Sequence, residues 1–355
     1  SKDNGSNYVE STSSSYTFNN LTSDATFYVK VYVKDSNNRE SSVSSTSIKT
    51  KSNSLASYIK SKYTSQGLNG LYYHDASLTD GANDNSYRFA GANPNNYVCF
   101  GSTQSPCPAD NLYRIIGVFD GRVKLIKSDY ATSALLGTDG NYKQTYTSTD
   151  NNSSYYKGNN LANVAVYHWS SSGRNIWSTS LLNKINLNTN FITNIGKEWV
   201  DKIDMTTWIV GGNNENFIFN KKAKSVYYGE VVKPDPGQWS TETEYSSKIG
   251  LMYVSDYMYA VPQEKWTLVG SKRSDASKDY RAATSVNWMY MGLNEWTIFR
   301  GSDSQIFASG VYDEGYLYYD GVYGQTFSVR PVFYLVSSVT YVSGDGTQSS
   351  PIRIN

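Results

Sequence analysis

Charged residues are scarce in this chain of 355 residues, where Asp, Glu, Lys and Arg together make up 18%, against about a quarter in ordinary globular proteins. Ser, Thr, Asn and Tyr must therefore supply most of the polar surface, a composition that favours a β-rich extracellular protein. With 32 basic and 31 acidic residues, the chain lacks the strong field that attracts nucleic acid or an anionic membrane. It also lacks a run of about 20 apolar residues, so the sequence predicts no membrane-spanning helix.

Cysteine and histidine are rare as well, with two of each. Cys99 and Cys107 enclose a short, Pro-flanked segment, while His74 and His168 lie far apart in the sequence. The spacing matches no zinc-ligand pattern, so no metal site is predicted. In an oxidising compartment the two cysteines are expected to form a disulfide that closes a small loop, with two free buried thiols as the alternative.

Residues 1–50 alternate between apolar and polar side chains from Phe27 to Val33, which is typical of a half-buried strand. A turn precedes this strand, an Asx turn follows it, and a Ser/Thr-rich strand comes last. The order resembles the second half of a fibronectin type III domain, although Phe27 stands where that family usually has a corner tyrosine. We therefore expect a partial all-β sandwich over 1–50, cut from a longer protein, and a polar linker over 51–54.

Residues 55–355 mix short strands, few helices and long loops, which predicts an α+β domain. Asp120-Gly121 between two apolar runs is the clearest hairpin signal. Further expected elements are a helix over 55–60, a helix capped by Ser178, a helix near 196–204, strands over 208–212 and 249–255, and a long exposed loop over 132–158.

Two apolar brackets enclose a tyrosine-rich segment near the C-terminus. Glu295-Trp296-Thr297, then Arg300-Gly301-Ser302, and finally Val329-Arg330-Pro331-Val332-Phe333 are similar to the C-terminal core of C-type lectin-like domains of the formylglycine-generating-enzyme type. Three further segments, Asn93–Gly101, Leu112–Phe119 and Ser343–Thr347, resemble motifs that recur in secreted or surface modules of gut Bacillota and their phages, and this resemblance covers most of 55–355. The resemblance implies a C-type lectin-like fold. It does not carry over the enzymatic activity, because no cysteine follows Cys107 to hold copper.

Within the brackets we expect Val311, Leu317 and Val322 to point inward and the aromatic side chains to face outward. Tyrosine supplies a large, rigid contact area at low entropy cost, and binding surfaces are therefore rich in it. The predicted ligand-binding residues are Trp288, Tyr290, Phe299, Tyr312, Asp313, Glu314, Tyr316, Tyr318, Tyr319 and Tyr323. Trp288 and Tyr290 either line the edge of this face or belong to the core.

The brackets themselves are expected to be structural. Arg330 lies in an apolar strand, so its charge needs a buried partner, and Glu295 is the candidate. Trp296 and Phe333 are also expected in the core, because they too lie in the apolar brackets.

Three chemical hypotheses are weaker. Asp303, Asp313, Glu314 and Asp320 offer oxygens for calcium, but loop acids are more often solvated. Asp256 and Glu295 would be a carboxylate pair for glycoside cleavage, yet nothing in the sequence sets their separation. His74-Asp75 is more simply a surface histidine beside a loop acid.

The sequence thus favours a non-enzymatic, extracellular or virion-associated protein that binds a protein or glycan on another surface and needs no cofactor. Such lectin-fold proteins are often diversified by retroelements that mutate adenines, and the residues between Phe299 and Gln325 are largely those that this process generates. The alternative is a structural subunit of a pilus, fibre or phage virion in which the same face packs on another copy. A glycoside-active enzyme is the remote third possibility.

Overall fold

The hairpin predicted around Asp120-Gly121 is present. The computed structural model describes residues 1–19, 21–50, 52–147, 154–214 and 216–355. In it β6 (Leu112–Phe119) pairs antiparallel with β7 (Arg122–Lys127). Asp120 and Gly121 have φ angles of 47° and 76°, the left-handed values that a two-residue hairpin turn requires. The hairpin prediction is confirmed.

This hairpin lies in the middle of a seven-stranded sheet with the order β13-β18-β7-β6-β4-β3, and β5 also pairs with β6. Its remaining strands are β3 (Leu71–Tyr73), β4 (Tyr87–Phe89), β5 (Tyr97–Cys99), β13 (Ile249–Gly250) and β18 (Val332–Tyr334). Ile115, Leu125 and Phe333 are fully buried, so the sheet forms one wall of the core.

A second seven-stranded sheet has the order β16-β15-β14-β17-β9-β8, with β11 also paired to β14. Its strands are β8 (Tyr142–Thr145), β9 (Ala165–Tyr167), β11 (Gly212–Asn213), β14 (Glu295–Gly301), β15 (Phe307–Val311), β16 (Leu317–Gly321) and β17 (Phe327–Ser328). Every residue of β14 is buried. The predicted inward residues Val311, Leu317 and Val322 are buried too.

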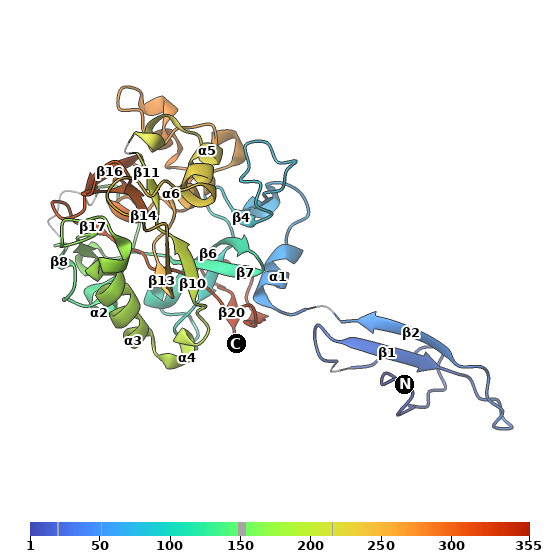
Figure 1. Ribbon diagram of the computed structural model, residues 1–355. Helices are drawn as coiled ribbons and strands as arrows, with labels where there is room; N and C mark the ends of the chain where they lie inside the picture. Colours follow the sequence, from blue (N-terminus) through green and yellow to red (C-terminus); the bar gives the residue numbers. More distant parts are fainter. Residues whose placement is uncertain (20, 51, 148–153, 215) are drawn as a thin grey trace.

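Short elements surround the two sheets (Figure 1). Two further strand pairs are β10 (Thr206–Ile209) with β12 (Glu244–Ser247) and β19 (Tyr341–Ser343) with β20 (Arg353–Ile354). The helices of four or more residues in the described parts of the chain are α1 (Leu55–Ser61), α2 (Ser133–Leu136), η6 (Leu182–Phe191), α3 (Ile192–Ile195), α4 (Lys197–Val200), η7 (Phe217–Asn220), α5 (Ala223–Tyr227), η8 (Tyr228–Val232), α6 (Val254–Tyr259) and η11 (Tyr280–Ala283). Mostly antiparallel sheets with separate short helices make this an α+β fold. In the part of the chain that the structure describes, no helix has the length and apolar character needed to cross a bilayer.

The first two predicted helices are both present, but the second begins later in the chain than predicted. Helix α1 begins where expected, because the Ser57 amide donates to the Ser54 hydroxyl at 3.2 Å and caps it. The next predicted helix starts later, with the Asn183 amide donating to Ser180 Oγ at 3.4 Å. Ser178 is instead part of the turn Trp177–Thr179 that precedes the helix.

Other boundaries differ because packing overrides local pattern. Only Ile249–Gly250 of the expected strand 249–255 is extended, and helix α6 begins at Val254. The strand expected over 208–212 lies earlier, at Thr206–Ile209, and the helix near 196–204 is reduced to Lys197–Val200.

The stretch 132–158 is not the single exposed loop that its composition predicts. It contains α2 and β8, and Leu136 at the end of α2 is fully buried. Residues 148–153 lie outside the described residues. The polar composition of this stretch therefore gave no indication of α2 and β8.

The N-terminal fifty residues form one hairpin of β1 (Thr26–Val31) and β2 (Ser44–Lys49), outside both large sheets (Figure 1). Phe27 and Val29 are half-buried as predicted. Val31 and Val33 are 59% and 69% exposed, so the predicted half-buried pattern is wrong for these two residues. They are exposed because this sheet consists of only two strands.

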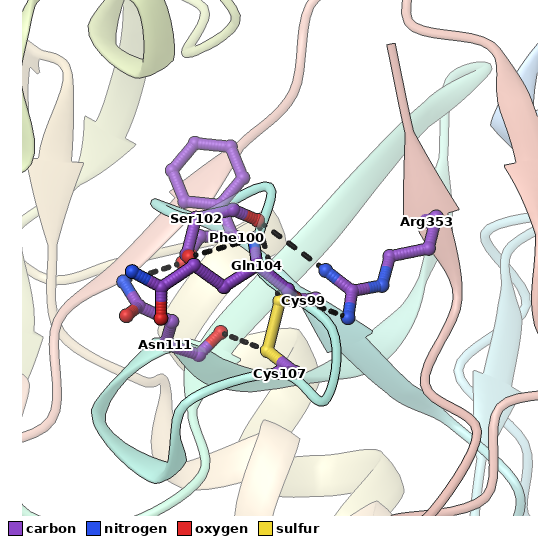
Figure 2. Close-up of a disulfide and its surroundings, with 7 residues drawn as sticks. All are labelled: Cys99, Phe100, Ser102, Gln104, Cys107, Asn111 and Arg353. Atoms are coloured by element: carbon purple, nitrogen blue, oxygen red, sulfur yellow. Dashed lines mark hydrogen bonds between the residues drawn. A yellow bond between two sulfur atoms is a disulfide. The ribbon is translucent and has the colours of Figure 1, made fainter.

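Cys99 and Cys107 form the predicted disulfide (Figure 2). The loop that it closes is tied to the C-terminal strand β20, since Arg353 donates to the carbonyl oxygens of Gln104 at 2.6 Å and Ser102 at 3.4 Å. The Asn111 amide donates to the Phe100 carbonyl at 3.2 Å. The disulfide therefore anchors the segment that connects β5 to β6.

Replacing both cysteines, Cys99→Ala with Cys107→Ala, is expected to lower the free energy of unfolding by about 2–3 kcal/mol, because the open loop gains entropy in the unfolded chain. Urea denaturation monitored by tryptophan fluorescence measures this loss. A reductant should destabilise the wild type by a similar amount and leave the double variant unchanged. Equal stability of the double variant and wild type would contradict the prediction.

Candidate functional site

The tyrosine-rich segment folds as the hairpin β15–β16 at one end of the second sheet. A tight loop joins the strands: the Tyr312 amide donates to the Tyr316 carbonyl at 2.8 Å, and the Gly315 amide to the Tyr312 carbonyl at 2.7 Å. Gly315 has a φ of +94°, and a Cβ there would lie 2.3 Å from Thr284 Cγ2. The loop therefore requires glycine and holds the flanking tyrosines in one geometry.

Three half-exposed rings lie together on this hairpin, and we call Tyr312, Tyr316 and Tyr318 the tyrosine platform. Tyr312 and Tyr316 are stacked with centroids 4.8 Å apart, and Tyr318 meets them edge-on at 6.0 and 6.5 Å. Successive side chains of a strand point to opposite faces, so Tyr318 faces outward while Leu317 is buried. Such ring pairs stabilise one another, and the platform is therefore preorganised.

Residues from other segments complete the surface around the platform. Phe219 of η7 stacks on Tyr318 at 4.9 Å, the Arg273 guanidinium lies 4.0 Å from the centroid of the Tyr318 ring, and that of Arg281 lies 5.1 Å from the Tyr316 centroid. Asp279 holds Arg281 through an N–O contact of 2.7 Å. Sequence analysis missed these three residues, because no local motif connects them to the tyrosines.

The electrostatics of the platform disfavour acid–base chemistry. Partial burial raises the pKa of Tyr316, and burial together with the hydrogen bond to Asp320 raises the pKa of Tyr312. Both phenols therefore stay protonated at neutral pH. The platform offers ring faces, hydroxyl groups and two arginines, a combination that suits recognition.

Two of the predicted binding residues point into the protein. Phe299 is 1% exposed and Tyr319 is 4% exposed. Phe299 lies on β14, which is buried along its whole length, and Tyr319 follows Tyr318 in β16 and so faces the other side. The prediction that these two side chains face outward is wrong.

Trp288 and Tyr290 belong to the core, which was one of the two possibilities. Trp288 is 3% exposed and donates its indole N–H to the Phe89 carbonyl at 2.8 Å. Tyr290 is 5% exposed and donates its hydroxyl hydrogen to the Asp313 carbonyl. Tyr290 thus supports the platform loop from beneath.

The remaining predicted residues are accessible but differ in their neighbours. Glu314 is exposed beside the platform, with a carboxylate oxygen 3.9 Å from Arg281. Asp313 is half-buried, and its amide donates to the side-chain oxygen of Asn294 at 2.8 Å. Tyr323 is 60% exposed and stacks on His168 with centroids 5.4 Å apart, so it lies against a different partner.

The structural roles assigned to the brackets are confirmed. Arg330 donates to both carboxylate oxygens of Glu295, each at 2.8 Å, and both residues are at most 2% exposed. Trp296 and Phe333 are fully buried. The brackets therefore belong to the core that carries the platform.

The weaker chemical hypotheses fit the geometry poorly. Among the residues that the structure describes, no group of three or more His, Cys, Asp or Glu side chains is placed to hold a metal ion, so the loop acids do not gather into a calcium site. Asp256 pairs with Lys124, whereas Glu295 pairs with Arg330. His74 is fully buried, not on the surface, and Asp75 bonds to Ser77 instead.

Comparison with known proteins does not assign the chain to a family. No family matches its sequence, and neither a curated protein nor a solved structure matches it.

Proposed function

We propose that this protein is a non-enzymatic, extracellular ligand-binding protein that recognises a protein or glycan on another surface through the tyrosine platform. The observation that carries the proposal is the cluster of three mutually packed, half-exposed tyrosines, with Arg273 over Tyr318 and Arg281 over Tyr316. Rigid aromatic groups with nearby arginine dominate the binding energy of many interfaces. The disulfide is consistent with an oxidising compartment.

We further propose that the domain is of the C-type lectin-like type and that a retroelement diversifies the segment between its brackets. The Glu295–Arg330 pair supports a division into a constant core and a separate surface, because it joins the two brackets inside the protein. Sequencing the locus tests diversification. A neighbouring template repeat and a reverse transcriptase gene are expected, and the lack of both would refute this part.

The fibre-subunit alternative has one supporting observation. Hairpin β1–β2 exposes apolar side chains, among them Val31, Val33 and Ile48 at 54–69% exposure. Exposed two-stranded hairpins tend to pair with strands of another chain. Sedimentation velocity distinguishes the roles, since concentration-dependent polymers would favour the fibre and a monomer would favour recognition by the platform.

Combining Tyr316→Ala with Tyr318→Ala is expected to weaken ligand binding by at least about 30-fold, because hot-spot aromatics contribute about 2 kcal/mol or more. Glycan and cell-surface protein arrays first identify the ligand, and surface plasmon resonance then measures its Kd.

The matched control is Tyr228→Ala, which removes a tyrosine that is 54% exposed and lies on η8. It should bind like the wild type. If the platform double variant, folded by circular dichroism, also binds with unchanged affinity, the site assignment is wrong.

A further inference from the structure

Lys124 and Asp256 form an ion pair inside the protein, although they lie 132 positions apart in the sequence. Lys124 belongs to β7 of the first sheet, and Asp256 lies in the first turn of helix α6. Lys124 Nζ donates to Asp256 Oδ2 at 2.5 Å, and each side chain is 1% exposed. The amine and the carboxylate are therefore held in direct contact and away from bulk water.

The core gains little from this pair as two charges. Moving an ammonium and a carboxylate out of water is costly, and well-packed apolar residues of similar volume are often at least as stable. Asp256 Oδ2 also accepts from the Tyr253 amide at 2.9 Å, whereas Oδ1 is buried without a hydrogen-bond partner among the described residues. A reaction that neutralises both charges and removes Oδ1 would relieve the cost of burying them.

Aromatic side chains surround the Lys124 amine. Its nitrogen lies 4.3 Å from the ring centroid of Tyr253, 5.5 Å from that of Tyr334 and 5.8 Å from that of Trp208. Burial lowers the pKa of Lys124, because an environment without water disfavours the ammonium form. The neutral amine is the form of lysine that acts as a nucleophile. These surroundings therefore favour attack by the amine and keep water from the product.

A third buried carboxyl group, Glu230 of η8, fixes the position of Asp256. Its two oxygens accept from the amides of Val254 and Ser255 at 2.7 and 2.9 Å, and these two residues directly precede Asp256. Burial raises the pKa of Glu230 to about 7, so this group exchanges a proton near neutral pH. Its charge acts on both Lys124 and Asp256. Glu230 is therefore a positioning residue that can also accept a proton.

We propose that Lys124 and Asp256 condense to an intramolecular isopeptide bond that ties β7 to helix α6. A proton moves from Nζ to the Asp256 carboxylate, and the lone pair of the neutral Nζ attacks Cγ. The N–C bond forms and the C–Oδ1 bond breaks, so that Oδ1 leaves as water with two of the three ammonium protons. Oδ2 remains as the amide oxygen and keeps its hydrogen bond from the Tyr253 amide. This bond does not depend on the ligand-binding function proposed above.

Intact mass spectrometry of the wild type, after reduction of its disulfide, tests the proposal. We expect the mass of the sequence less that of one water molecule. Peptide mapping after trypsin digestion should find a branched peptide that joins Lys124 to Asp256, because trypsin does not cleave after an acylated lysine. The pair Lys197–Asp201 is the matched control within the same molecule. Its Nζ–Oδ2 distance is 2.6 Å, but its side chains are 85% and 60% exposed, so it should stay unlinked.

Two variants separate the bond from the fold. Lys124→Arg keeps a cation beside Asp256 but has no primary amine, so it should have the full mass of its sequence. Glu230→Gln, with an unchanged circular dichroism spectrum, should show a linked fraction at least about tenfold lower than the wild type, because it cannot accept a proton. A merely structural role of Glu230 would leave the linked fraction of the folded protein unchanged.

The wild type provides the deciding measurement, so the test does not depend on whether a variant folds. The proposal is overturned if the wild type has the full mass of its sequence or if the lost water maps to other residues. It is also overturned if folded Lys124→Arg loses water. Equal linkage in Glu230→Gln and the wild type would overturn the role assigned to Glu230.

Discussion

Arg330→Met is expected to lower the free energy of unfolding by about 3–5 kcal/mol, because it leaves the Glu295 carboxylate buried without its cation. Arg330 makes two bonds of 2.8 Å to Glu295 and a third of 2.7 Å to the Met289 carbonyl. These bonds join β14 to the strand region before β18 and to the segment that leads into β14. Losing them removes the link between both brackets.

Urea denaturation of Arg330→Met and of the double variant Arg330→Met with Glu295→Met measures this effect. Replacing both charges removes the unpaired carboxylate, so the double variant should be more stable than the single one. Lys197→Met is the control, since its ion pair with Asp201 is on the surface and contributes little. A single variant as stable as Lys197→Met would refute the structural role of Arg330.

Trp296→Ala is the second large effect, with an expected loss of about 3–5 kcal/mol, as for other buried aromatic truncations. Trp296 is fully buried, and its ring stacks on Phe327 with centroids 4.1 Å apart. Its indole N–H donates to the Tyr167 carbonyl at 2.8 Å. The variant therefore opens a cavity and removes one hydrogen bond to a buried carbonyl.

Thermal and urea denaturation of Trp296→Ala give the loss directly. Trp239→Ala is the matched control, because Trp239 is 49% exposed and its removal creates no interior cavity. Trp296→Phe should lie between wild type and alanine, since it keeps a ring but loses the hydrogen bond. If the two alanine variants lose equal stability, Trp296 does not have the core role that its burial indicates.

The tyrosine-rich segment shows which side-chain orientations the local sequence predicts and which it does not. Alternation along a strand correctly predicted that Leu317 is inside, but it also requires Tyr318 and Tyr319 to face opposite sides. Treating all the tyrosines as surface residues ignored that rule, and Tyr319 is buried. Phe299 is buried because it packs against Phe217 and Tyr319, with ring centroids 6.3 and 6.1 Å apart, and neither contact is a local property of the sequence.

Residues that complete a site from distant parts of the chain were beyond prediction. Phe219 of η7 and Arg273 of a separate loop both contact Tyr318, and Lys124 and Asp256 meet across 132 positions. Asp256 entered the sequence argument only as a partner of Glu295 in glycoside cleavage. Its actual partner became visible only when β7 and α6 were packed together.

The sequence by itself determined features that depend on a few neighbouring residues, and those that follow from the high free-energy cost of burying an unpaired charge. The Asp120-Gly121 turn follows from allowed backbone angles, the disulfide follows from a short spacing in a cysteine-poor chain, and the Arg330–Glu295 pair follows because a buried charge needs a partner. The tertiary structure alone decided which tyrosines form the platform and which carboxylate pairs with the buried Lys124. Both depend on which strands and helices become neighbours, and long-range packing, not local pattern, sets that arrangement.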